Sequence, residues 1–167
     1  ATEIANWKPT TVVHLAYRKG DRLNIVQGSR NVARAAAAVG AHLVHMSTDV
    51  VFGGRPEPYT EWDPPSPIED YGRDKTDAEA AVAAAHPTAV LVRTSLVYGT
   101  HHLAIPQFDV QQVLGRQSSM RFFTDEVRCP VHGDDLAAAV VTLAGRPDIT
   151  GPLHVAGPEA VSRATFA

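Results

Sequence analysis

Short apolar runs alternate along this chain with segments whose apolar residues recur at helical spacing. The runs at residues 11–16, 41–46 and 89–97 have the length and composition of buried strands. Between them, residues 21–39 and 69–85 have the pattern of helices that cover a sheet. Strands that alternate with helices are typical of βαβ units. The sequence therefore predicts an α/β fold, in which a parallel sheet has helices on both faces.

The remaining segments predict smaller elements. Residues 2–7 fit the end of a helix, and residues 53–67 contain five prolines, which favours a loop. The other expected elements are helices at 106–114 and 134–144, strands at 120–123 and 152–156, and a last helix capped by Ser162.

The composition narrows the class of protein. The chain has 167 residues, a formal net charge of −3, 44% hydrophobic and 20% charged residues. These values favour a globular domain and give no electrostatic reason to expect nucleic acid or an anionic membrane as a partner. Cys129 is the one cysteine, which excludes a disulfide framework and a cysteine-based zinc site within the chain and favours the reducing cytoplasm.

Hydroxyl and aromatic side chains follow the predicted strands where each of them ends. In an open parallel sheet, ligands bind at the carboxyl ends of the strands. Those ends are Ala16 and Tyr17 after the first strand, residues 47–49 after the second and residues 94–96 after the third. The sequence predicts that these three segments line one crevice.

Tyr71 and Lys75 stand four residues apart at the start of a predicted helix, which places both side chains on one face. A free phenol has a pKa near ~10, and a neighbouring ammonium lowers it by stabilising phenolate. With the hydroxyl of Thr48, the pair could polarise and protonate a carbonyl oxygen. The alternative is an exposed helix pair with no chemical role.

Several motifs resemble those of one family, in the same order along nearly the whole chain. They are His14-Leu-Ala, Ser47-Thr-Asp-x-Val-Phe, Pro58-Tyr-Thr-Glu, Tyr71-Gly-Arg-x-Lys, Arg93-Thr-Ser and His154-Val-Ala-Gly-Pro. The chain resembles the extended short-chain dehydrogenase/reductases and, more narrowly, the dTDP-4-dehydrorhamnose reductase branch, which acts on sugar nucleotides. The fold that this resemblance implies is a partial Rossmann-like, doubly wound parallel sheet with a small C-terminal substrate lobe.

The resemblance also implies roles for particular residues. Tyr71 would be the proton donor, Lys75 would bind the nicotinamide ribose, and Thr48 would hold the reacting oxygen. The expected reaction is reduction of a 4-keto sugar nucleotide with NADP or NAD as cofactor, and a homodimer is one assembly open to such a chain. The implied cofactor contacts are Leu15, Ala16, Tyr17, Ser47, Tyr71, Lys75, Thr94 and Ser95, and the implied substrate contacts are Asp49, Val50 and Leu96.

The chain departs from the family in three ways. It has no Gly-x-x-Gly-x-x-Gly turn, so the resemblance implies that it begins near the fourth strand, with residues 1–98 in the nucleotide-binding domain and 99–167 in a mixed segment and substrate lobe. Val50 and Leu96 stand where the branch usually has Tyr and often has Trp. The segments 17–24 and 99–108 are short for the family.

Other functions and roles stay open. The same fold occurs in the regulatory subunit of methionine adenosyltransferase, and an epimerase or dehydratase acting on a sugar nucleotide is a third alternative.

Asp49 could contact substrate or fix its own loop. His42 and His45, three apart on a strand, should point to opposite faces and cannot share a metal. His101 and His102, adjacent in a loop, are expected to be a surface pair. His132, with Asp134 and Asp135, could belong to a helix cap or to a cation site.

Overall fold

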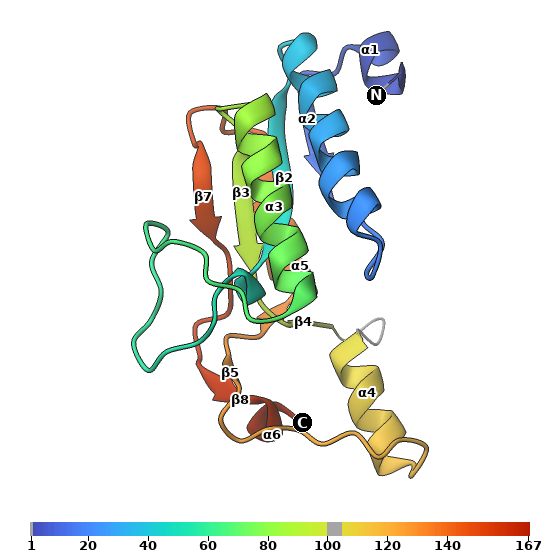
Figure 1. Ribbon diagram of the computed structural model, residues 1–167, viewed down its shortest axis with the longest axis vertical. Coiled ribbons are helices and arrows are strands. Elements are labelled where there is room, and N and C mark those ends of the chain that lie inside the picture. The colour runs from blue at the N-terminus through green and yellow to red at the C-terminus, as the bar shows by residue number, and fades with distance from the viewer. Residues whose placement is uncertain (1, 100–104) are drawn as a thin grey trace. The chain divides into compact units, whose positions relative to one another are not determined.

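The computed structural model describes residues 2–99 and 105–167 (Figure 1). They form two compact units. The first contains the described residues up to Arg93 together with Ala139–His154, and the second contains Thr94–Ala138 and Val155–Ala167.

The first unit is built on a four-stranded sheet in the order β1-β2-β3-β7. Its strands are β1 (Thr11–His14), β2 (His42–Thr48), β3 (Val90–Thr94) and β7 (Gly151–His154). β1 pairs with β2, and β3 with β7, in parallel. The prediction of an α/β fold with a parallel sheet is confirmed.

The helices of this unit precede the first strand or lie between successive strands. They are α1 (Thr2–Trp7), the π-helical segment η1 (Leu23–Gly28), α2 (Ser29–Ala38), the short 3₁₀ turn η2 (Asp49–Val51) and α3 (Asp70–Ala85). The helix expected over residues 21–39 therefore begins with π geometry. Apolar spacing predicted the helix but not this change in the hydrogen-bonding pattern of its first turns.

The core lies between one face of the sheet and the helices α2 and α3, which lie side by side in front of it (Figure 1). Leu43 on β2 packs there with small residues of α2 and with Val82 of α3. Because successive side chains of a strand alternate, His42 points to the other face, where its Nε2 lies 3.1 Å from the carbonyl oxygen of Leu143. Leu143 belongs to α5 (Gly133–Ala144), so helices flank both faces of the sheet.

The second unit contains two small sheets. β4 (Val97–Tyr98) pairs in parallel with β6 (Val131–His132), and β5 (Val127–Arg128) pairs antiparallel with β8 (Val161–Ser162). Its helices are α4 (Ile105–Leu114) and α6 (Arg163–Phe166), which begins at Ser162. The Ser162 hydroxyl accepts a hydrogen bond from the amide of Thr165 at 3.0 Å, as expected of a cap.

One strand prediction is wrong in this region, and another is confirmed only in part. Residues 120–123 form no strand, because Met120 and Phe123 remain 46% and 61% exposed and β5 pairs with β8 instead. The strand expected over residues 89–97 is interrupted after Thr94, where the Leu96 carbonyl accepts from the Val131 amide at 2.8 Å. An apolar run alone does not reveal where a strand changes its partner.

Gly72, in the first turn of α3, lies against the loop that follows β2. A Cβ at this position would stand 2.3 Å from the carbonyl oxygen of Val50 and 3.0 Å from Cβ of Pro67. The backbones of α3 and the loop therefore approach more closely than any side chain at residue 72 would allow.

We expect Gly72→Ala to lower the free energy of unfolding by about 1–3 kcal/mol, the usual cost of overpacking. Urea unfolding of both proteins measures the effect. Gly28→Ala is the matched control, because a Cβ there meets nothing within 4 Å and alanine favours a helix. A Gly72 variant as stable as the Gly28 variant would contradict the close approach.

Candidate active site

The carboxyl ends of β1 and β2 lie next to each other, because the two strands are paired in parallel up to His14 and His45. Leu15, Ala16 and Tyr17 follow β1 directly, and all three are exposed. Three predicted cofactor contacts are therefore accessible at this edge of the sheet.

Tyr71 and Lys75 lie one turn apart on α3, and Tyr17 contacts both of them. The rings of Tyr17 and Tyr71 have centroids 5.9 Å apart, and Nζ of Lys75 lies 5.3 Å from the Tyr17 ring. Lys75 is 3% exposed, and its ammonium donates to the carbonyl oxygen of Met46 at 2.7 Å. The structure thus brings together one predicted cofactor contact and the predicted Tyr–Lys pair.

The charge of Lys75 is held in a buried position. Burial lowers the pKa of Lys75 from 10.5 to about 8, while the Glu79 carboxylate one turn further along α3 acts in the opposite direction. Lys75 therefore stays largely protonated at neutral pH, but it loses its proton more readily than an exposed lysine.

The lowered pKa of Lys75 predicts how stability depends on pH. Between about pH 8 and 10.5, the unfolded chain keeps a proton on this lysine that the folded chain has lost. Because the unfolded chain binds more protons, the contribution of Lys75 to the free energy of unfolding should increase with pH across this interval. Urea unfolding of wild type and Lys75→Met should show a steeper rise for wild type, and equal slopes would contradict the lowered pKa.

Thr48, at the end of β2, is buried and caps the turn η2. Its hydroxyl donates to Oδ1 of Asp49 at 3.3 Å and accepts from the Val50 amide at 3.4 Å. Both bonds are long, so they are weak. Asp49 thus contributes to the local structure of this turn, while contact of Asp49 or Val50 with substrate stays a prediction.

A buried ion pair supports the site from within the first unit, and no role was predicted for either of its members. Arg93 on β3 donates to both carboxylate oxygens of Glu79, and the two side chains are 4% and 6% exposed. Ser47 also donates to Glu79, at 2.5 Å. The spacing could have pointed to Glu79, because it lies one turn after Lys75 on α3. The hydroxyl of Ser47 is thus engaged here, and its contact with a cofactor stays a prediction.

His14 and His45 form a second buried contact beside Lys75. Their Nδ1 atoms are 3.0 Å apart, so one ring donates and the other accepts. Burial, and after it the charge of Lys75, lower the pKa of each histidine, most strongly for His45. Both rings are therefore neutral at pH 7. His45 pairs with His14 while His42 bonds across the other face, as the spacing predicted.

The proline-rich loop after η2 is fixed by aromatic and charged contacts. Phe52 stacks on Tyr59 with centroids 4.1 Å apart, and the guanidinium of Arg93 lies 5.1 Å from the Phe52 ring. Arg55 pairs with Asp63 at 2.8 Å and lowers the pKa of that carboxyl. These contacts connect the Pro-Tyr-Thr-Glu motif to the ion pair beneath the site.

Three predicted contacts lie in the second unit. Thr94 ends β3 with a buried hydroxyl that has no hydrogen-bond partner among the described residues. The hydroxyl of Ser95 accepts from the Cys129 amide at 3.2 Å, and the Leu96 carbonyl accepts from Val131. Cofactor contact by Thr94 and Ser95, and substrate contact by Leu96, stay predictions.

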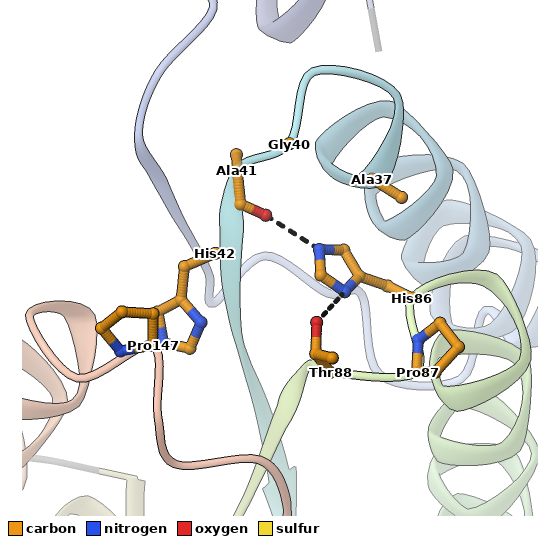
Figure 2. Close-up of a pocket in the computed structure, with 8 residues that line it drawn as sticks. All are labelled: Ala37, Gly40, Ala41, His42, His86, Pro87, Thr88 and Pro147. Atoms are coloured by element: carbon orange, nitrogen blue, oxygen red, sulfur yellow. Dashed lines mark hydrogen bonds between the residues drawn. The ribbon is translucent and has the colours of Figure 1, made fainter.

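A shallow hollow of about 360 Å³ opens at the amino ends of β2 and β3, away from the residues described above (Figure 2). Both ring nitrogens of His86 are engaged there, Nε2 with the carbonyl oxygen of Ala41 at 2.8 Å and Nδ1 with the Thr88 hydroxyl at 3.3 Å. These contacts close the end of α3. The residues that line the hollow are Ala37, Gly40, Ala41, His42, His86, Pro87, Thr88 and Pro147.

The remaining histidine signals give no metal centre in the part of the chain that the structure describes. No group of three or more His, Cys, Asp or Glu residues there could hold an ion. Nδ1 of His132 accepts from the Asp134 amide at 3.3 Å, so the histidine caps α5. His101 and His102 lie outside the described residues. Within residues 2–99 and 105–167, no helix is both long and apolar enough to cross a membrane.

The parallel sheet and its helices agree with comparisons to known proteins. The chain belongs to the RmlD substrate-binding domain family, which matches residues 4–167. The resemblance to the dTDP-4-dehydrorhamnose reductase branch is thereby confirmed, and so is the Rossmann-like fold.

Individual proteins of known name are similar to this chain. A dTDP-4-dehydrorhamnose reductase of Sinorhizobium fredii is 36% identical over 84% of this chain and 49% of its own length. Methionine adenosyltransferase 2 subunit beta of Rattus norvegicus is 32% identical over 96% of this chain and 53% of its own. The crystal structure of the Bacillus anthracis reductase in complex with NADP has a TM-score of 0.84 at 30% identity, covering 99% of this chain and 62% of that one. The chain spans about half the length of the curated relatives it matches.

Proposed function

We propose that the chain supplies the proton-handling groups of an NAD(P)-dependent oxidoreductase that reduces a 4-keto sugar nucleotide. The contact of Tyr17 with both Tyr71 and the buried ammonium of Lys75 carries this proposal. It is supported by family membership and by the relatives named as dTDP-4-dehydrorhamnose reductases.

The residues at the edge of the sheet fit a nicotinamide cofactor. The ammonium of Lys75 has three N–H groups. One hydrogen bond, to Met46, engages it among the described residues, which leaves donors for ribose hydroxyls. Leu15, Ala16 and Tyr17 offer an exposed surface beside it, and the similar Bacillus anthracis reductase was solved with NADP. When bound, the reduced nicotinamide supplies the hydride for the carbonyl carbon.

The side chains of this chain would supply the proton. The phenol of Tyr71 donates its proton to the carbonyl oxygen as negative charge develops there, and Lys75 stabilises the phenolate that remains. The hydroxyl of Thr48 holds the same oxygen. Because the Thr48–Asp49 hydrogen bond is long, exchanging it for one to substrate costs little.

The test follows nicotinamide absorbance while the complete polypeptide is mixed with NADPH or NADH and a panel of 4-keto sugar nucleotides. The expected result is oxidation of the cofactor with at least one member of the panel. No turnover with any member would overturn the proposal.

A subunit role is the second candidate, and the 32% identity to methionine adenosyltransferase 2 subunit beta favours it. In that case the sheet and helices would present a surface to an enzyme. The two functions are separated by a pull-down with methionine adenosyltransferase alongside the absorbance assay. Binding without turnover would support the subunit role.

A further inference from the structure

A second ammonium lies at Tyr71. Nζ of Lys19 is 5.5 Å from the centroid of the Tyr71 ring, and Lys19 is exposed. Lys19 belongs to the same loop as Tyr17, the segment between β1 and η1. This loop therefore contributes both an aromatic ring and a cation to the surroundings of Tyr71.

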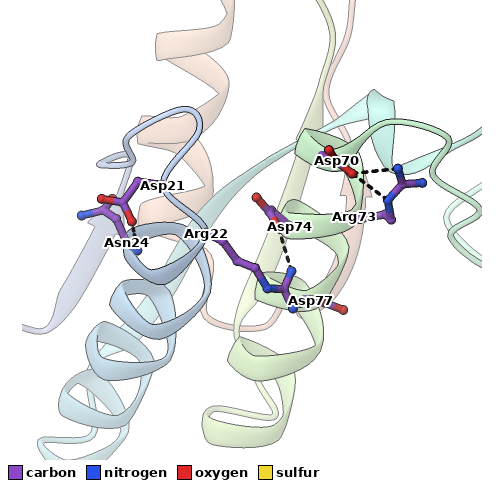
Figure 3. Close-up of polar contacts among 7 residues, drawn as sticks. All are labelled: Asp21, Arg22, Asn24, Asp70, Arg73, Asp74 and Asp77. Atoms are coloured by element: carbon purple, nitrogen blue, oxygen red, sulfur yellow. Dashed lines mark hydrogen bonds and ion pairs between the residues drawn. The ribbon is translucent and has the colours of Figure 1, made fainter.

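An ion-pair clamp fixes the end of this loop to α3 (Figure 3). The two terminal guanidinium nitrogens of Arg22 contact Asp74 at 2.6 Å and Asp77 at 2.5 Å. The two aspartates follow Tyr71 on α3 by three and six residues. Just before Arg22, Asp21 accepts from the Asn24 amide at 3.0 Å and so fixes the beginning of η1. The clamp holds Lys19 against the helix that carries Tyr71.

The acidic residues that neighbour Tyr71 on α3 are paired with arginines. On α3, Asp70 is paired with Arg73 and Asp74 with Arg22, while the N-terminus of the helix adds partial positive charge. The charged and titratable groups that contact Tyr71 or lie beside it are Tyr17 and Lys19 of the loop, Arg22 at the end of the loop, and Asp70, Arg73, Asp74 and Lys75 of α3.

We propose that Lys19 is a positioning residue that acts through Tyr71, where its ammonium favours the phenolate together with Lys75. The meaning of this for catalysis rests on the proposed function, whereas the electrostatic effect on Tyr71 does not. Lys75 acts from a buried position and Lys19 from the solvent side. The two cations therefore differ in how salt affects them.

Removing the charge of Lys19 should raise the pKa of Tyr71. An exposed unit charge at this separation changes the phenolate-to-phenol ratio by about threefold, a pKa shift of roughly 0.5. The difference should shrink at 1 M salt, where the screening length falls to about 3 Å.

Carbon-13 NMR of protein labelled at tyrosine Cζ measures the effect without any enzyme assay. The resonance of Tyr71 is identified by its loss in Tyr71→Phe, and its titration is compared between wild type and Lys19→Gln. Lys19→Arg should restore the wild-type titration. Arg18→Gln is the matched control, because it removes an equal, exposed charge from the adjacent residue, whereas the ammonium that lies over the Tyr71 ring belongs to Lys19.

A raised pKa in Lys19→Gln, restored by Lys19→Arg and absent in Arg18→Gln, supports the proposal. No shift, or an equal shift in Arg18→Gln, overturns it, because the effect would then be absent or due to net charge alone. If the enzyme reduces a keto sugar, the pH profile of kcat should shift by the same amount in Lys19→Gln. A shift in the NMR titration of an inactive protein would uphold the role of Lys19 and count against the reductase function alone.

Discussion

Tyr71→Phe is expected to lower kcat/KM for reduction of a keto sugar nucleotide by roughly 10²–10⁴-fold, the usual contribution of a positioned proton donor. The substitution removes one hydroxyl and keeps the ring, so the contact with Tyr17 should persist. Stopped-flow or steady-state measurement of NADPH oxidation gives the ratio.

Tyr59→Phe is the matched control for this loss. Tyr59 belongs to the same unit, and its ring stacks on Phe52 through contacts that the substitution preserves. We expect its activity to stay within a few-fold of wild type. If both tyrosine variants kept wild-type activity, Tyr71 would not be the proton donor, and the assignment of that role would be wrong.

Breaking the buried Glu79–Arg93 pair should have the largest effect on stability. Removing one partner of a buried ion pair leaves the other charge uncompensated and typically costs about 3–5 kcal/mol. Glu79→Gln and Arg93→Met should each lower the free energy of unfolding by that order. Glu79→Gln should also lower the pKa of Lys75 further, because the carboxylate that raises it is gone.

A double-mutant cycle isolates the pair. Glu79→Gln combined with Arg93→Met removes both charges, so the double variant should be more stable than the sum of the single losses implies. Arg73→Met breaks the exposed Asp70–Arg73 pair and should cost less than about 1 kcal/mol. Additive losses at residues 79 and 93, or losses no larger than at Arg73, would show that the buried pair is not coupled.

Local patterns in the sequence predicted the elements that position the site. The helix expected over residues 69–85 is α3, Asp70–Ala85, because its propensities, Pro67 before it and His86-Pro87 after it agree. The second strand was expected over residues 41–46 and extends to Thr48. Both depend on short-range features, such as helix propensity and apolar runs, that a single sequence displays.

Contacts between distant residues were beyond such patterns. Glu79 and Arg93 are 14 residues apart on a helix and a strand, and a charged residue on a helix usually indicates a solvated face. The cation of Lys19 over Tyr71 depends on how a loop folds back, which has no periodicity. The strand expected over residues 120–123 failed for the same reason, because whether an apolar run becomes a strand depends on a partner elsewhere in the chain.

The approach of Val50 to Gly72 joins two backbones, and the side chain of residue 50 takes no part in it. The first turn of α3 is therefore positioned against a backbone carbonyl, a group that every amino acid possesses. The contact restricts residue 72 to glycine, whereas at residue 50 it uses only the backbone carbonyl. Under the proposed function, a change of the side chain at residue 50 could therefore alter the contact with substrate while the position of Tyr71 on α3 is kept.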